Sequence, residues 1–96
     1  MSAVYCDGSR LVAEDLSSLH AFAAKIGIPR EAFRFGKKGN GPGRPTHPHY
    51  PISSVAMVQK VLDAGAVRCS EHFAERMGRT VSNQIRMGTI PAHLWQ

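Results

Sequence analysis

Cysteine is scarce in this 96-residue chain, which contains two cysteines in all. Cys6 and Cys69 stand far apart, and neither belongs to a CxxC pair of the kind that binds a structural metal or exchanges electrons. This spacing argues against a disulfide-stapled or zinc-stapled fold. We interpret both residues as buried reduced thiols, with a disulfide between them as the alternative.

Long hydrophobic runs are also absent, although hydrophobic residues make up 43% of the chain. No apolar segment approaches the roughly 20 residues that a membrane-spanning helix needs. The first residues show neither a basic segment before an apolar stretch nor a small-residue cleavage site, which are the marks of a secretory signal. We therefore expect a cytoplasmic protein without a membrane contact.

Acidic residues are few: 7 Asp and Glu face 12 Lys and Arg, which gives a formal net charge of +5. Most of the excess falls in one central segment, where Glu31 is the single acid. The basic residues of that segment are Arg30, Arg34, Lys37, Lys38 and Arg44. Such a cluster favours an anionic partner over a surface that is merely solubilising.

Strand and helix signals alternate along the first two thirds of the chain, whose length suits one domain, residues 1–96, with a thin core. The expected elements are a strand over 3–6, a helix over 15–26, a second strand over 33–35, a helix from Ser53 or Ser54 to Gly65, and a third strand over 66–69. This order predicts an α/β fold with a small, mainly parallel three-stranded sheet and right-handed crossover helices.

Apolar residues at helical spacing define the faces expected to be buried. Asp15 is the expected N-cap of the first helix, and Gly27 is expected to follow its last turn. The predicted core positions are Leu16, Leu19, Phe22, Ala23 and Ile26 in the first helix, and Val55, Val58 and Leu62 in the second, where Met57 and Val61 widen the buried stripe.

Residues 36–51, GKKGNGPGRPTHPHYP, contain four glycines and four prolines and read as a long basic loop. Its glycines lack the GK[ST] signature, so a P-loop is not predicted.

The residue pattern of the tail, residues 70–96, predicts a short helical segment. Its expected helices run from Ser70 to Gly78 and from Thr80 or Ser82 to Gly88. Trp95 is expected to fold onto the core as a latch.

Short motifs within residues 3–67 resemble a known family. VYCDG, LHAFAAKIG, a Phe near position 35, HYP and DAGA follow one another in this order. The pattern resembles domain-of-unknown-function family 4031 of phage and bacterial proteins, whose members typically read YVDD, LHAFA, HYD and GA. The matching motif residues are Asp7, His20, His49 and Tyr50. Gly8 and Pro51 replace two acids of the family pattern, which weakens any enzymatic role carried over from it.

The tail also resembles a second group. AERMGRTVSNQIRMGTIPAHLW is similar to the second half of phage-repressor helix-turn-helix units, in which VSxxxxxGxIP follows the recognition helix. Between Gly78 and Val81 about three residues of the usual turn are missing, which argues against the standard recognition geometry.

The leading functional hypothesis is a site for a phosphate-bearing ligand, such as a nucleotide or nucleotide-derived signal, at the start of the helix that follows residues 36–51. Unpaired backbone N–H groups there form a positive pole, and basic side chains lead into it. The predicted ligand-binding residues are Asp7, His20, Arg44, His47, His49, Tyr50, Ser53 and Ser54. A role in countering host defence would suit the family resemblance. The alternative is an ordinary N-cap beside a solvated loop.

A metal-dependent hydrolase with a metal or general acid/base site is a further hypothesis, because Asp7, His20, His47 and His49 are ligand types that zinc or manganese accepts, although the sequence leans against an enzyme. His20, however, lies roughly 100° from the centre of its helix's apolar stripe, a position typical of a boundary histidine bonded to a neighbour. We assign no catalytic residues and no cofactor from the sequence.

Nucleic-acid binding is the alternative that uses the basic loop and the tail together. Arginines and lysines would contact phosphates, while Asn and Gln could read adenine edges. The candidate residues are Lys37, Lys38, Arg76, Arg79, Asn83, Gln84 and Arg86. Inhibition of a host protein is a third hypothesis, and a homodimer would help to stabilise so thin a core.

Overall fold

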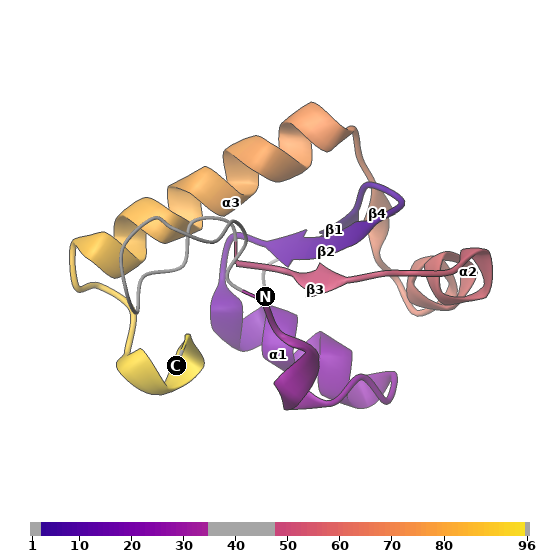
Figure 1. Ribbon diagram of the computed structural model, residues 1–96, viewed down its shortest axis with the longest axis horizontal. Coiled ribbons are helices and arrows are strands. Elements are labelled where there is room, and N and C mark those ends of the chain that lie inside the picture. The colour runs from indigo at the N-terminus through magenta and orange to yellow at the C-terminus, as the bar shows by residue number, and fades with distance from the viewer. Residues whose placement is uncertain (1–2, 35–47, 96) are drawn as a thin grey trace.

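The computed structural model describes residues 3–34 and 48–95. Within them, four short strands form one sheet in the order β3-β2-β1-β4 (Figure 1). The strands are β1 Val4–Cys6, β2 Arg10–Ala13, β3 Tyr50–Pro51 and β4 Val67–Arg68. The helices are α1 Leu16–Lys25, α2 Val55–Asp63 and α3 Glu71–Arg86, with single 3-10 turns at η1 Arg30–Ala32 and η2 Ala92–Leu94. The fold is α/β, as predicted.

The prediction of a mainly parallel, three-stranded sheet is wrong. β1 pairs in parallel with β4, but β2 pairs antiparallel with both β1 and β3. The strand missed from the sequence is β2, which a tight turn over residues 7–9 folds back onto β1. Gly8 has a backbone φ angle of +101° in that turn, a conformation that residues other than glycine rarely adopt. In the predicted strand over 33–35, Arg34 forms an isolated bridge with His49, and Phe35 lies outside the described residues.

Helices α1 and α3 cover opposite faces of the sheet (Figure 1). Side chains alternate between the two faces of a strand, so Cys6 and Leu11 join the cluster that includes α1, while Val12 packs against Ala74 and Met77 of α3. Both cysteines are free thiols, with Cys6 buried and Cys69 half-buried.

Side-chain caps set the starts of the three helices. Asp15 accepts a hydrogen bond from the Ser17 amide, Ser54 from Met57, and Ser70 from Phe73. The predicted caps at Asp15, Ser54 and Ser70 are therefore confirmed, and so is the burial of most of the α1 stripe.

The predicted buried stripe of α2 is confirmed at Met57 and Val61 but wrong in its centre, above all at Val55. Val55 is 87% exposed and Val58 and Leu62 are only half-buried, whereas Val61 is fully buried. The contact of α2 with β1 is thus centred on Val61, which was predicted at the edge of the stripe, and Val55 at the start of the helix lies outside it. α2 lies at one end of the molecule and packs on the main core through Met57, Val58, Val61 and Leu62 (Figure 1).

The prediction of two short helices in the tail is also wrong, because α3 runs without interruption from Glu71 to Arg86. Gly78 is buried within the helix and does not end it. Buried residues recur every three or four positions through this point, which gives one continuous contact face: Ala74, Met77, Gly78, Val81, Ser82 and Ile85. Trp95 is half-buried and packs against the core, as predicted. None of the helices in the described ranges is long and apolar enough to cross a membrane.

Candidate functional site

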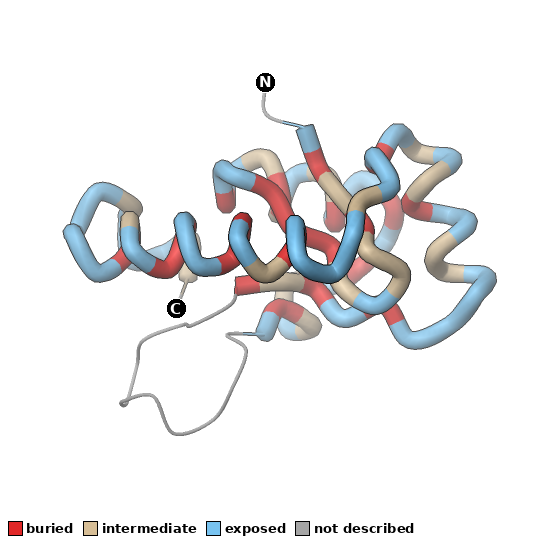
Figure 2. Tube along the Cα trace, turned by 90° about the horizontal axis from the view of Figure 1, so that it is seen from above, coloured by how far each residue is buried: buried red, intermediate tan, exposed pale blue. Residues whose placement is uncertain are grey.

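One exposed face of α3 carries most of the predicted nucleic-acid residues. At about 100° per residue, its members fall within an arc of roughly 80° on the side opposite the buried positions. We call it the basic face, and its members are His72, Arg76, Arg79, Asn83 and Arg86. Figure 2 shows buried and exposed positions alternating along α3, which lies across the front of that view. The helix is thus anchored on one side and presents the basic face to solvent on the other.

The arginines of the basic face are not neutralised within the described residues. Arg76, Arg79 and Arg86 have no carboxylate within ion-pair distance there. Glu75 is half-buried and lies on the flank of the helix, outside the arc. These guanidinium groups can therefore accept an anionic ligand without first giving up a partner.

Gln84, the other predicted base-reading residue, points away from the basic face. It lines a cavity of about 330 Å³ between the start of α1 and the tail. Its backbone carbonyl accepts hydrogen bonds from the amide and hydroxyl of Thr89, at 3.1 and 2.9 Å. The other residues around this cavity are Glu14, Asp15, Leu16, Ile90, Pro91 and Leu94. Lys37 and Lys38 lie outside the described residues.

His72 belongs to the basic face but was not predicted from the sequence. It stands four positions before Arg76, the spacing of neighbours on one helix face. The same spacing continues through Arg79, Asn83 and Arg86. This spacing runs through Gly78 and is typical of a single helix, with the glycine inside it.

His20 forms a half-buried junction of hydrogen bonds instead of an open ligand site. Its Nδ1 lies 2.6 Å from the hydroxyl of Tyr50, and its Nε2 lies 2.5 Å from the carbonyl oxygen of Leu94. A carbonyl can only accept, so Nε2 carries the proton and Tyr50 donates to Nδ1. The ring also packs edge-on against Phe33, with centroids 4.7 Å apart. The prediction of a boundary histidine bonded to a neighbour is confirmed.

The surroundings of His20 favour this neutral form. Burial lowers its pKa, and the charge of Arg30 acts in the same direction, against the hydrogen bond to the Leu94 carbonyl. Burial also raises the pKa of Tyr50, which keeps the hydroxyl protonated as a donor. Both ring nitrogens of His20 are thus occupied, and the junction ties α1, β3 and the tail together.

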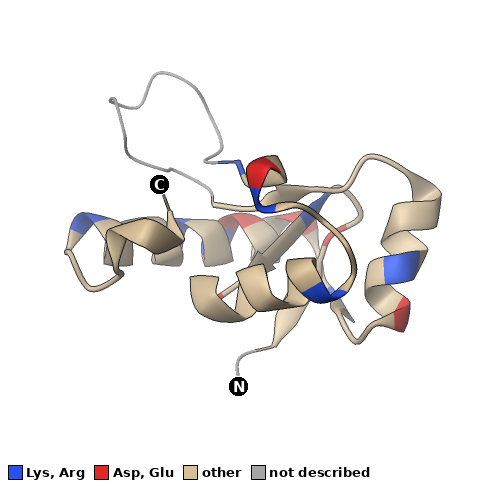
Figure 3. Ribbon diagram, turned by 90° about the horizontal axis from the view of Figure 1, so that it is seen from below, with Lys and Arg blue, Asp and Glu red and all other residues tan. Residues whose placement is uncertain are grey.

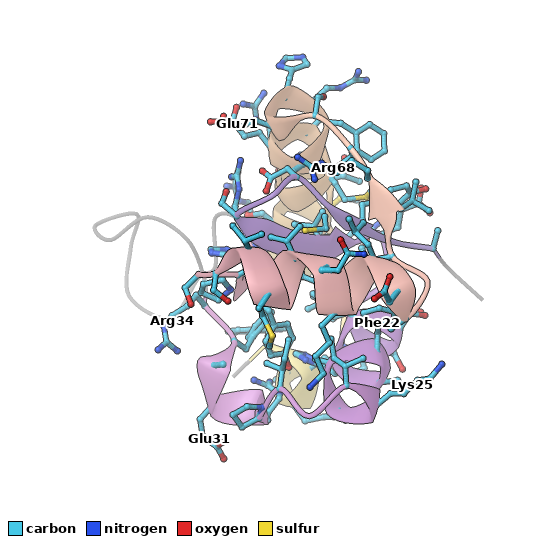
Figure 4. All side chains as sticks on the ribbon, turned by 90° about the vertical axis from the view of Figure 1, so that its right-hand side faces the viewer. Phe22, Lys25, Glu31, Arg34, Arg68 and Glu71 are labelled. Carbon is cyan, nitrogen blue, oxygen red and sulfur yellow. The ribbon has the colours of Figure 1, made fainter. Side chains whose placement is uncertain are left out.

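Asp7 lies in the turn between β1 and β2, and it shares no hydrogen bond with His20. Its carboxylate accepts from the amides of Ser9 and Arg10 at 2.9 and 2.7 Å and forms an ion pair with the Arg10 guanidinium at 3.0 Å. Burial acts to raise the pKa of Asp7, but these hydrogen bonds and the charge of Arg10 outweigh it, so the pKa is lowered. Arg68 of β4 lies over the same turn, close to Gly8 (Figure 4).

The predicted phosphate site falls partly on β3 and the start of α2. His49 pairs with Arg34 through its backbone, at N···O distances of 3.0 and 2.8 Å. Ser53 is exposed, and the Ser54 hydroxyl is used as the α2 cap. Arg44 and His47 lie outside the described residues. Nucleotide binding at this position therefore stays a prediction.

The described histidines, cysteines and acids do not come together as a metal site. In residues 3–34 and 48–95, no group of three or more such side chains is placed to hold a metal ion. His47, a member of the hypothetical set, lies outside these ranges.

The motifs that suggested a family meet in the folded chain, since His20 of LHAFA and Tyr50 of HYP share a hydrogen bond. The family model of DUF4031, a protein of unknown function, matches residues 6–81. This chain belongs to the DUF4031 family. The match begins at the last residue of β1 and includes β2, His20, Tyr50 and the first part of α3 with His72, Arg76 and Arg79. Asn83, Arg86 and Leu94 lie beyond the matched residues. None of the curated proteins and none of the solved structures compared matches this DUF4031 chain.

Proposed function

We propose that this protein binds nucleic acid through the basic face of α3. The observation that carries the proposal is the placement of Arg76, Arg79, Asn83 and Arg86 on one exposed side of a single anchored helix. Phosphate contacts by arginine supply most of the affinity of nucleic-acid-binding proteins, and a neutral amide can add base recognition.

The spacing of the arginines suits a polyanion better than a single phosphate. Arg76 and Arg86 are ten residues apart, which is about 15 Å along the helix at 1.5 Å per residue. One phosphate group cannot reach both guanidinium groups of a rigid helix at that separation. A nucleic-acid backbone presents many phosphates along such a length, so all three arginines can be engaged together.

The charge of the whole chain supports the same partner. The formal net charge is +5, and the arginines of the basic face are free of competing carboxylates in the described structure. Long-range attraction of this kind raises the rate at which a polyanion meets the protein, and it weakens as salt is added.

The experiment is a binding titration of a labelled 20-base-pair duplex at low salt. The test variant carries Arg76→Gln, Arg79→Gln and Arg86→Gln, which removes three charges but keeps long, helix-compatible side chains. The matched control carries Lys25→Gln, Lys60→Gln and Arg68→Gln, which removes the same charge from exposed positions on α1, α2 and β4 (Figure 3).

We expect the basic-face variant to bind at least tenfold more weakly than the control variant, since about three phosphate contacts are lost. Circular dichroism should show both variants folded. Equal affinities of the two variants would mean that net charge alone attracts the duplex, and the proposal would be wrong.

A further inference from the structure

We infer that the basic face enters the major groove of double-stranded B-form DNA and that Asn83 contacts an adenine there. This inference rests on the proposed function and names the substrate class and the specificity-determining residue. It is built on the shape of α3, on the chemistry of its exposed side chains and on the environment of Asn83.

The shape of α3 fits a wide groove. An α-helix with its side chains is roughly 10–12 Å across, and the major groove of B-DNA is about 12 Å wide and 8.5 Å deep. The basic face is the convex side of a helix whose other side is packed on the sheet and core (Figure 1). Double-stranded RNA has a deep and narrow major groove that side chains cannot read, so it does not suit this face.

The chemistry of the face also argues against single strands. Proteins that bind single strands use a concave groove and aromatic side chains on which bases stack. The five residues of the basic face include no Phe, Tyr or Trp. Phe73 of α3 lies outside the arc, and its ring pairs with that of Tyr5 in β1 at a centroid distance of 4.9 Å.

Asn83 is the neutral amide of the basic face. It is exposed and lies one helical turn from both Arg79 and Arg86, so a contact by these arginines to phosphates would place its side chain over the bases. A carboxamide can donate to N7 and accept from N6 of adenine at the same time, which makes Asn an adenine-reading residue. The other candidate, Gln84, faces the cavity next to the tail.

The polar neighbours of Asn83 are engaged elsewhere. The Thr80 hydroxyl donates to the Arg76 carbonyl at 3.0 Å, and Ser82 is buried. Asn83 is therefore the neutral polar side chain of α3 that is placed to read a base, and we assign the arginines on either side to phosphate contacts.

The experiment is a selection from a random-sequence duplex library with the wild-type chain, followed by titration of the enriched sequence. The test variant is Asn83→Ala, and the matched control is Gln84→Ala, which removes an amide from the adjacent position. We expect the wild type and Gln84→Ala to enrich the same adenine-containing site. Asn83→Ala should bind that site about 5- to 100-fold more weakly, with the preference lost at one base pair.

Three results would overturn the inference. They are enrichment of the same site by Asn83→Ala, no enriched sequence with the wild type, or equal affinity for duplex DNA, duplex RNA and single-stranded DNA. None of these three results removes the proposed function if the triple arginine variant still binds the duplex more weakly than its charge-matched control. Loss of that difference would instead remove the proposed function itself.

Discussion

The hydroxyl of Tyr50 donates a hydrogen bond to Nδ1 of His20 across 2.6 Å, and so joins two motifs that lie 30 residues apart in the chain. Tyr50 is 1% exposed, and the other ring nitrogen of His20 donates to the carbonyl of Leu94 in the tail. The junction therefore holds α1, β3 and the tail at one point. This explains why a polar pair occupies the interior of so small a protein.

Tyr50→Phe tests the contribution of this hydrogen bond. The variant keeps the ring packing but leaves Nδ1 of His20 half-buried without its donor, so the free energy of unfolding should fall by about 1–3 kcal/mol. Urea denaturation at pH 7.5 measures the change. An unchanged midpoint would show that solvent replaces the hydroxyl and that the bond stabilises nothing.

The lowered pKa of His20 predicts the direction of a pH effect. Below the ordinary histidine pKa of 6.5, the unfolded chain takes up a proton at residue 20 that the folded chain resists. Stability rises with pH wherever the unfolded state binds more protons, so His20 makes the protein less stable as the pH falls from 6.5 and has no effect above that range. Thermal melts between pH 8 and pH 5 should show a smaller acid loss for His20→Gln than for the wild type. Parallel curves would contradict the prediction.

Local signals predicted α1 and the starts of α2 and α3 well, because caps and apolar spacing act over a few residues. Asp15 caps α1, and Leu16, Leu19 and Ala23 are buried as the pattern indicated. The sheet was harder to predict, since its strands are two to four residues long and pair across distant parts of the chain. The Asp-Gly pair at positions 7 and 8 is typical of a hairpin turn, but the predicted set of strands contains no partner for β1 directly after it.

Asp7→Asn tests the turn that creates this hairpin. The amide keeps an oxygen for the Ser9 and Arg10 N–H groups but loses the charge that pairs with the Arg10 guanidinium at 3.0 Å. The Asp7 side chain is fully buried, so we expect a loss of about 2 kcal/mol in urea denaturation. Asp15→Asn is the control, because it retains a capping oxygen at an exposed position and should cost less than about 1 kcal/mol. The reverse order of the two losses would show that the Asp7–Arg10 pair does not hold the turn.

The continuity of α3 can be checked by amide hydrogen exchange. A single helix keeps the amides of residues 79–82 bonded to carbonyls one turn earlier, so they should be protected like those on either side of them. Rapid exchange confined to these four amides would instead support the two short helices that the sequence suggested.

The sequence predicted four residues of the basic face, but it did not predict that they lie on one side of a single helix. Arg76, Arg79, Asn83 and Arg86 were named from the sequence, whereas their common face depends on Gly78 being buried inside a helix. A glycine ends a helix only when the apolar period also ends there, and here the period continues through Val81 and Ile85. The partners of His20, at Tyr50 and Leu94, are fixed by the tertiary fold and leave no local signal.

The salt dependence of DNA binding counts the phosphate contacts that the basic face makes. For duplex DNA, the logarithm of the binding constant falls with the logarithm of salt concentration with a slope of about −0.9 for each phosphate neutralised. Arg79→Gln should therefore make the slope less steep by about 0.9, because its guanidinium is exposed and has no carboxylate partner in the described residues. Lys60→Gln on α2 removes the same charge away from the basic face and should leave the slope as it is in the wild type. If both variants change the slope equally, the DNA follows the charge of the whole protein, and Arg79 makes no phosphate contact of its own.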